Sequence, residues 1–196
     1  MAPRIHQAGG APVLWIIQWA KSATWRNEFD IPIRNFAKVS EGVYRGALPG
    51  ADAYLPLANK LGVRRVLSLT EGARERDREA ALAGGVREWR HIPFADREKP
   101  KPERVREWLD VVRTAPTDGA IYTHCMGGRH RTGVLIAVLR VADHGWTKQR
   151  AFREMLDFGW YDARGHRPLR EWFFHDFDPA DFAPTGEAVA AVTRDS

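Results

Sequence analysis

Short apolar runs that are typical of β-strands alternate along the chain with longer segments that have the periodicity of helices. The strand-like runs lie at residues 39–45, 65–70, 86–93 and 120–124. The helical segments lie at residues 55–61, 74–82, 102–112, 134–139 and 169–177, with one more after Thr147. This alternation predicts an α/β fold, in which a single domain has a central, mostly parallel sheet flanked by helices.

Three of the predicted helices carry apolar residues that indicate how each one packs. The helix that begins at Pro102 has a stripe at i, i+3, i+4 and i+7, formed by Val105, Trp108, Leu109 and Val112. Residues 134–139 are apolar on all sides, so we expect this helix to be buried. The helix capped by Thr147 is expected to present one apolar face, made of Phe152, Met155, Leu156 and Gly159.

The length of the chain suits one folded unit. Its 196 residues, of which 44% are hydrophobic, suffice for one core and are too few for two ordinary domains. We expect a domain at residues 39–178, an N-terminal extension at residues 1–38 and a flexible tail at residues 179–196. The apolar run at residues 13–20 is far shorter than the roughly 20 residues that cross a bilayer, so no membrane span is expected. Packing of this run on the domain is favoured over a signal peptide.

Charge and cysteine usage narrow the function classes. The 30 Lys and Arg residues exceed the 25 Asp and Glu residues, and the net charge of +5 favours anionic ligands. These basic residues are scattered and are not interleaved with aromatic ones, so we expect no nucleic acid partner. One cysteine excludes an intramolecular disulfide and a Cys-rich zinc site, so we expect neither a metal nor another cofactor. A cytoplasmic location is therefore favoured over a secreted or periplasmic one.

The chemistry is concentrated in one loop, at residues 124–133, between a predicted strand and a predicted buried helix. A glycine-rich loop in this position presents backbone N–H groups and a helix N-terminus to an anion. Phosphate is the anion that we expect to bind there. Five residues separate Cys125 from Arg131, enough for a cup with the sulfur at its base and the guanidinium at its rim. The helix N-terminus and nearby cations lower the pKa of such a thiol from about 8.5, so Cys125 is the predicted nucleophile.

The remaining loop residues receive supporting roles. Thr132 either donates its hydroxyl to the thiolate or makes an ordinary backbone bond at the start of the helix, and both readings stay open. The substrate-binding residues are expected to be Met126, Gly127, Gly128, Arg129 and His130. Arg129 and His130 would add one permanent and one titratable positive charge, which suits a crowded polyanion, unless both side chains point outward. A zinc site that uses His130 is rejected, because its ligands in this loop would be too crowded.

The motif His-Cys-x5-Arg-Thr-Gly resembles the signature of the protein tyrosine phosphatase superfamily. Residues 128–133 are similar to the Gly-Lys-His-Arg-Thr-Gly ending of the plant and fungal atypical dual-specificity phosphatases, with Arg129 in place of the lysine. Met126 and Gly127 replace the usual basic pair of that group. Residues 43–49 and 62–69 resemble two strands of these enzymes, so the resemblance covers about residues 39 to 176.

The resemblance implies a cysteine-dependent phosphatase that forms a phosphocysteine intermediate without a metal. It also implies an Asp on a mobile loop as the general acid, for which Asp96 is the candidate and Glu98 the rival. The implied substrates are inositol phosphates or phosphoinositides, or else phosphotyrosine and phosphoserine proteins. Two other functions stay open, a rhodanese-like sulfurtransferase and a catalytically inactive phosphate-binding module.

Overall fold

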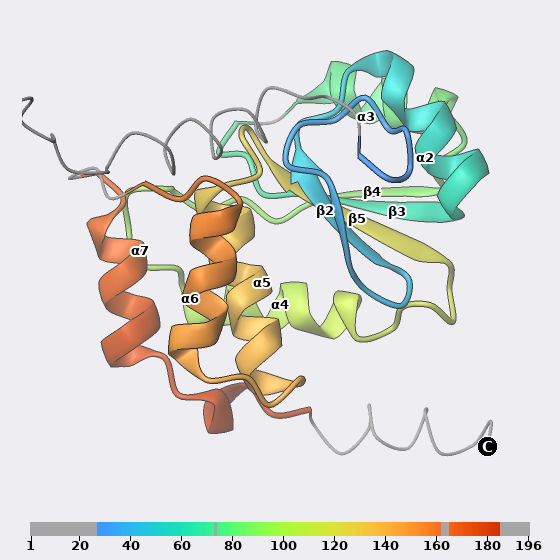
Figure 1. Cartoon of the computed structure of the whole chain (residues 1–196). Coiled ribbons are helices and arrows are strands. Elements are labelled where there is room, and N and C mark those ends of the chain that lie inside the picture. The colour runs from blue at the N-terminus through green and yellow to red at the C-terminus, as the bar shows by residue number, and fades with distance from the viewer. Residues whose placement is uncertain (1–26, 73, 162–164, 185–196) are drawn as a thin grey trace, which may run out of the picture.

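The computed structural model describes residues 27–72, 74–161 and 165–184, and its centre is a five-stranded sheet (Figure 1). The strands are β1 (Ala37–Ser40), β2 (Val43–Ala47), β3 (Val63–Ser68), β4 (Glu88–His91) and β5 (Ala120–Cys125). Their order across the sheet is β1-β2-β5-β3-β4, and only the β1 and β2 pair is antiparallel. The predicted α/β class with a mostly parallel sheet is therefore confirmed.

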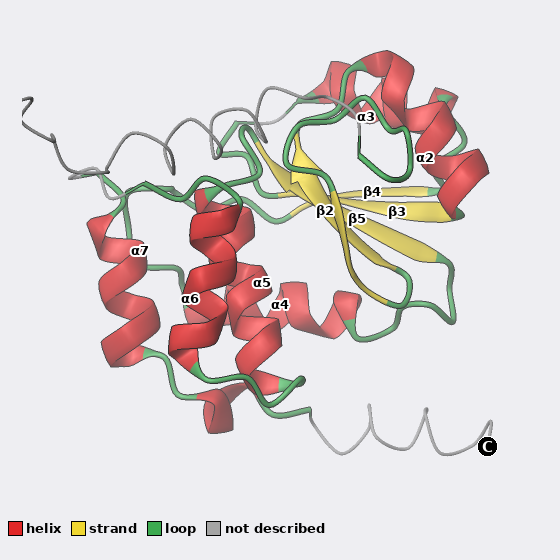
Figure 2. Ribbon diagram, viewed as in Figure 1, coloured by secondary structure: helices red, strands yellow, loops and turns green. Residues whose placement is uncertain are grey.

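Helices cover both faces of the sheet (Figure 2). Helices α2 (Tyr54–Leu61) and α3 (Glu75–Ala83) lie on one face, with a short η1 turn (Ala51–Ala53) before α2. The other face carries α4 (Pro102–Val112), α5 (His130–Ala142), α6 (Lys148–Asp157) and α7 (Arg167–Glu171), then the turns η2 (Trp172–Asp176) and η3 (Pro179–Phe182). None of the helices in the described part of the chain is long and apolar enough to cross a membrane.

The helices bury the faces that their sequences predict, with one exception. The apolar stripe of α4 is buried, and the indole N–H of Trp108 donates to Thr123 Oγ1 on β5 at 3.0 Å. Every position of α5 from 130 to 139 is buried. In α6 the Thr147 cap forms as expected, but Leu156 is 37% exposed and the buried positions are Ala151 and Met155. Met155 and Phe152 of the predicted face do pack on the core, so the prediction holds in part, and the exposed Leu156 departs from it.

Buried residues also lie on both sides of the expected domain at residues 39–178. Ile31, Ile33 and Phe36 are buried in the core beneath α2, so part of the expected extension belongs to the fold. At the other end Phe182 is 4% exposed and packs against Trp172, so the expected flexible tail begins with a packed turn. The apolar run at residues 13–20 and the last residues, 185–196, lie outside the described residues.

The sheet order places one strand end at the centre of the molecule. Strand β5 lies between β2 and β3 and runs parallel to both, and it ends at Cys125. In open parallel sheets, ligands bind beyond the carboxyl ends of the strands. The loop after β5 is the predicted phosphate loop, and the loop after β4 contains Asp96, so both reach the same edge of the sheet.

Candidate active site

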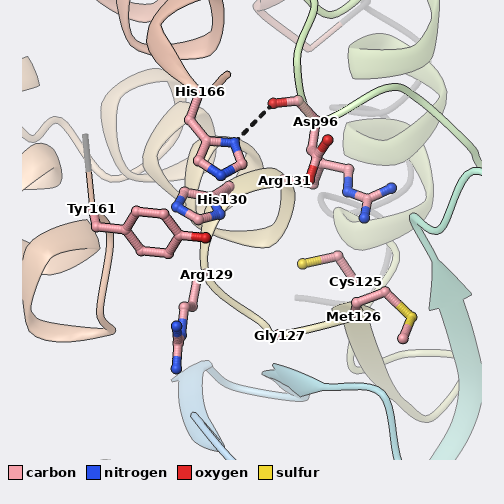
Figure 3. Close-up of a pocket in the computed structure, with 9 residues that line it drawn as sticks. All are labelled: Asp96, Cys125, Met126, Gly127, Arg129, His130, Arg131, Tyr161 and His166. Atoms are coloured by element: carbon pink, nitrogen blue, oxygen red, sulfur yellow. Dashed lines mark hydrogen bonds between the residues drawn. The ribbon is translucent and has the colours of Figure 1, made fainter. Parts of the chain in front are cut away.

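A cavity of about 170 Å³ opens at the carboxyl end of β5 (Figure 3). It is lined by Asp96, Cys125, Met126, Gly127, Arg129, His130, Arg131, Tyr161 and His166. Seven of the nine predicted site residues are among them, and the other two, Gly128 and Thr132, lie outside the lining. The close-up shows the sulfur of Cys125 on one side of the cavity and three aromatic rings on the other.

The carbonyl groups of the loop are held from the segment that contains β1 and β2. The backbone N–H of Leu48 donates to the carbonyl of Met126 at 3.3 Å. The side-chain amide of Asn35 donates to the carbonyl of Gly127 at 2.7 Å. These carbonyls accept hydrogen bonds from residues of a different segment. The N–H groups of the loop can therefore point toward a bound anion.

A third consecutive carbonyl, that of Gly128, accepts from the guanidinium of Arg45 on β2 at 2.6 Å. Arg45 is 1% exposed, and its guanidinium lies over the ring of Phe158, 3.9 Å from the centroid. Gly128 has a φ of +64°, and a Cβ there would lie 2.4 Å from the carbonyl carbon of Gly46. Only glycine fits at position 128, because both the backbone conformation and the space exclude a side chain.

Cys125 is 4% exposed at the base of the cup. Burial opposes ionisation of the thiol, but the hydroxyl and N–H of Thr132, the charge of Arg131 and the N–H of Arg129 together lower the pKa of Cys125 below its ordinary value. The buried Thr132 hydroxyl has no hydrogen-bond partner among the described residues, backbone or side chain, so it remains available to the thiolate whose pKa it lowers. Behind the loop, burial lowers the pKa of His124 to about 4, so this ring is a neutral part of the support.

Arg131 is 6% exposed and is fixed beside the cavity by backbone carbonyl groups. Its Nη1 donates to the carbonyl of Leu69 at 3.1 Å and to that of Phe94 at 3.3 Å. The carboxylate of Glu71 lies 3.7 Å from the same nitrogen. These contacts hold one side of the guanidinium, so its remaining N–H groups are available to phosphoryl oxygens.

Asp96 lines the cavity, whereas Glu98 is exposed and is not part of the lining. The backbone of Asp96 is held on both sides. Its N–H donates to Glu71 Oε1 at 3.3 Å, and its carbonyl accepts from His166 Nδ1 at 3.2 Å. Of the two acid candidates, the geometry therefore favours Asp96.

His130 differs from the expectation that it adds a titratable positive charge to the cup. The ring is 8% exposed and stacks on His166 with 3.5 Å between centroids, and Trp160 and Tyr161 pack edge-on against it. Burial, followed by the nearby His166 ring, lowers the pKa of His130 to about 4. The prediction is wrong because an aromatic cluster excludes the water that a charged ring needs, so at neutral pH His130 is uncharged. Arg129 lines the cavity.

Four residues of the site escape prediction from the sequence. Tyr161 and His166 line the cavity, and Asn35 and Arg45 hold the loop from behind. None of them belongs to the loop motif, although Arg45 ends the predicted strand at residues 39–45. Within residues 27–72, 74–161 and 165–184, no group of three or more His, Cys, Asp or Glu side chains is arranged to hold a metal ion.

Comparison with known proteins gives related sequences from bacteria and plants. Dual specificity protein phosphatase TpbA of Pseudomonas aeruginosa is 32% identical over 142 residues, which cover 72% of this chain and 62% of TpbA. Inositol diphosphatase DSP1 of Oryza sativa is 33% identical over 138 residues, 68% of this chain and 61% of the rice protein. The chain therefore matches about three fifths of the length of these relatives.

Solved structures share the fold. The crystal structure of P. aeruginosa TpbA has a TM-score of 0.65 and 28% identity, and the match covers 83% of this chain and 96% of that one. The core catalytic domain of the PP-IP phosphatase SIW14 from S. cerevisiae has a TM-score of 0.65 at 20% identity, over 83% and 93% of the two chains. The family model described as "Tyrosine phosphatase family" matches residues 30–189, which include the whole cavity. This chain belongs to the tyrosine phosphatase family.

Proposed function

We propose that this protein is a cysteine-dependent phosphatase that hydrolyses phosphomonoesters through a phosphocysteine intermediate. The observation that carries the proposal is the Cys125 thiol, which has a lowered pKa at the base of a loop whose carbonyls are held from outside. Attack on a bound phosphoryl group needs an ionised nucleophile and donors aimed at the phosphoryl oxygens. Relatives named as a dual specificity phosphatase and an inositol diphosphatase support the same reaction class.

In the first step, the Cys125 thiolate attacks phosphorus and forms the S–P bond while the P–O bond to the leaving group breaks. The leaving oxygen takes a proton from the Asp96 carboxyl group. Arg131 and the loop N–H groups bind the non-bridging oxygens, on which charge accumulates. In the second step, Asp96 takes a proton from water, the water oxygen bonds to phosphorus, and the S–P bond breaks. Inorganic phosphate leaves, and the thiolate and the protonated acid are restored.

The cavity favours a phosphoprotein over a highly phosphorylated inositol. Its lining contains two arginines, Arg129 and Arg131, and burial lowers the pKa of His130 to about 4, so that ring adds no charge at neutral pH. Met126 and Tyr161, which also line the cavity, are 49% and 50% exposed and offer apolar surface to a protein substrate. One phosphoryl group on an aromatic side chain matches this arrangement, whereas a ring with many phosphates needs more cations.

Replacement of the nucleophile tests the reaction. The variant Cys125→Ser should lose turnover by more than about 1000-fold, as is usual when a covalent nucleophile is removed, while it still binds a phosphotyrosine peptide in calorimetry. Substantial turnover by this variant would refute the mechanism. Thiosulfate turnover by the unmodified protein would instead identify a sulfurtransferase, and absence of turnover on every phosphoester would indicate an inactive binding module.

A substrate panel separates the two substrate classes. Phosphotyrosine peptides, phosphoserine peptides and highly phosphorylated inositols should be compared by kcat/KM under one salt concentration. We expect the phosphotyrosine peptides to give the highest value, and a higher value for the inositols would reverse this order.

We place the protein in the cytoplasm, because a single reactive thiol is best preserved in a reducing compartment. Cell fractionation tests that location.

A further inference from the structure

His166 connects two parts of the site that are far apart in the sequence. It lies immediately before α7, is 7% exposed and lines the cavity. Its Nδ1 donates to the backbone carbonyl of Asp96, seventy residues away in the chain, at 3.2 Å. Because a carbonyl only accepts, this bond fixes the proton on Nδ1 of the histidine. The dashed line in Figure 3 marks this bond.

The same ring packs against the phosphate loop. Its plane is 17° from that of His130, and the ring centroids are 3.5 Å apart. His130 begins α5 and directly precedes Arg131, whose guanidinium is held beside the cavity. One side chain therefore contacts the loop of the proposed acid with its edge and the start of α5 with its face.

The two segments also lie close together at the residue next to His166. A Cβ at Gly165 would lie 3.3 Å from Cγ and Nε of Arg97, the residue after Asp96. Residues 165 and 166 thus approach two successive residues of the acid loop. A general acid must stand within hydrogen-bond reach of the leaving oxygen, and a displacement of about 1 Å is enough to cost roughly 100-fold in rate.

We propose that His166 is a positioning residue, which holds the backbone of Asp96 and stacks on His130 so that the acid is fixed relative to the phosphate cup. This inference rests on the proposed function, in which Asp96 protonates the leaving oxygen. It assigns to His166 an effect on the proton-transfer part of the reaction, and no contact with the reacting atoms.

The test uses leaving groups of different basicity. A poor leaving group, such as the phenol of phenyl phosphate, needs the proton from the acid, whereas 2,4-dinitrophenolate leaves without it. The variant His166→Phe keeps an aromatic ring for the stack and removes the donor. We expect its kcat/KM for phenyl phosphate, which reports the steps up to cleavage of the P–O bond, to fall at least tenfold, while kcat/KM for 2,4-dinitrophenyl phosphate changes less than threefold. The variant His166→Asn, which offers a donor near the position of Nδ1, should recover part of the loss.

Matched variants separate the possible outcomes. His175→Phe makes the same change at an exposed histidine in η2 and should leave both rates unchanged. An equal loss with both leaving groups, or none, in His166→Phe would overturn the positioning role, and His166→Leu replaces it if the Phe variant does not fold. If Asp96→Asn lacks the leaving-group effect, the acid assignment and this inference both fail. Turnover by Cys125→Ser would instead remove the proposed function itself.

Discussion

At the scale of single residues, burial and hydrogen-bond donors have opposite effects on the pKa of Cys125. Burial in the cup disfavours the thiolate, and the neighbouring Thr132 hydroxyl is the first of the groups that reverse this effect. The hydroxyl is available for that purpose because no other described residue accepts a hydrogen bond from it. The ionisation of the nucleophile therefore relies on one side chain of α5 as well as on the helix N-terminus.

Removal of this hydroxyl should raise the pKa of Cys125. We expect Thr132→Val to move the midpoint of alkylation by iodoacetamide to higher pH and to reduce the thiolate fraction at pH 7, because the charged form loses a donor that the neutral thiol does not need. Alkylation rates measured from pH 5 to 10 report the midpoint. Thr132→Ser keeps the hydroxyl and serves as the control, and equal midpoints in the Val variant and the unmodified protein would contradict the role.

Gly128 provides a second prediction at this scale, with a matched control in Gly145. Both glycines have a φ near +65°, but a Cβ at Gly145 meets nothing within 4 Å, whereas one at Gly128 meets the backbone of Gly46. Gly145→Ala should cost about 1 kcal/mol of unfolding free energy, from backbone strain alone. Gly128→Ala should cost more and also abolish turnover, as measured by urea unfolding and phosphatase assay. An equal loss of unfolding free energy in the two variants would show that the backbone of Gly46 moves to make room for the added Cβ.

At the scale of elements, the phosphate loop depends on the hairpin of β1 and β2. Arg45 supplies the hydrogen bond to Gly128, and burial lowers the pKa of Arg45 to about 10, so it is still charged at neutral pH. Its Nε and Nη1 have no hydrogen-bond partner among the described residues. Burial of a charge with few hydrogen-bond partners lowers the stability of the folded protein. We therefore infer that the bond from Arg45 to Gly128 maintains the shape of the phosphate loop more than it stabilises the fold.

Replacement of this arginine should therefore separate activity from stability. Arg45→Met removes the donor and the charge but keeps much of the apolar volume against Phe158. We expect kcat/KM to fall at least about tenfold, the scale of one lost bond to a charged group, while the unfolding free energy changes little or rises. Arg64→Met, at a half-buried arginine on β3 outside the cavity, is the control. A large loss of stability with unchanged kcat/KM in Arg45→Met would contradict this account.

At the scale of the whole molecule, the sequence predicts site residues that are contiguous in the chain. It does not predict contacts between segments that are far apart in the chain. The strand, loop and helix around Cys125 are contiguous, so their residues could be identified from spacing alone. Asn35 and His166 reach the site from segments that are 92 and 70 residues away from their partners. No periodicity encodes such contacts, since they depend on how β1 and α7 pack. The prediction of a charged His130 fails for the same reason, because its aromatic surroundings come from Trp160, Tyr161 and His166, which lie beyond α6 in the chain.

The C-terminal end of the folded domain also depends on contacts between segments that are far apart in the chain. Phe182 lies in η3 against Trp172 and Phe177, and the Arg113 guanidinium donates to its carbonyl at 2.5 Å. A residue in a flexible tail would tolerate truncation, whereas a buried Phe→Ala change costs about 3 kcal/mol or more. We expect Phe182→Ala to approach that loss in urea unfolding.

Leu55→Ala provides the comparison, because Leu55 is 56% exposed and its truncation should cost less than about 1 kcal/mol. If the two variants unfold at the same urea concentration, the domain ends near residue 178 and η3 adds nothing to the core. If Phe182→Ala is the less stable, η3 closes the core that α4 and α5 share behind the phosphate loop. Truncation before residue 182 would then weaken the scaffold of the active site, although residue 182 does not line the cavity.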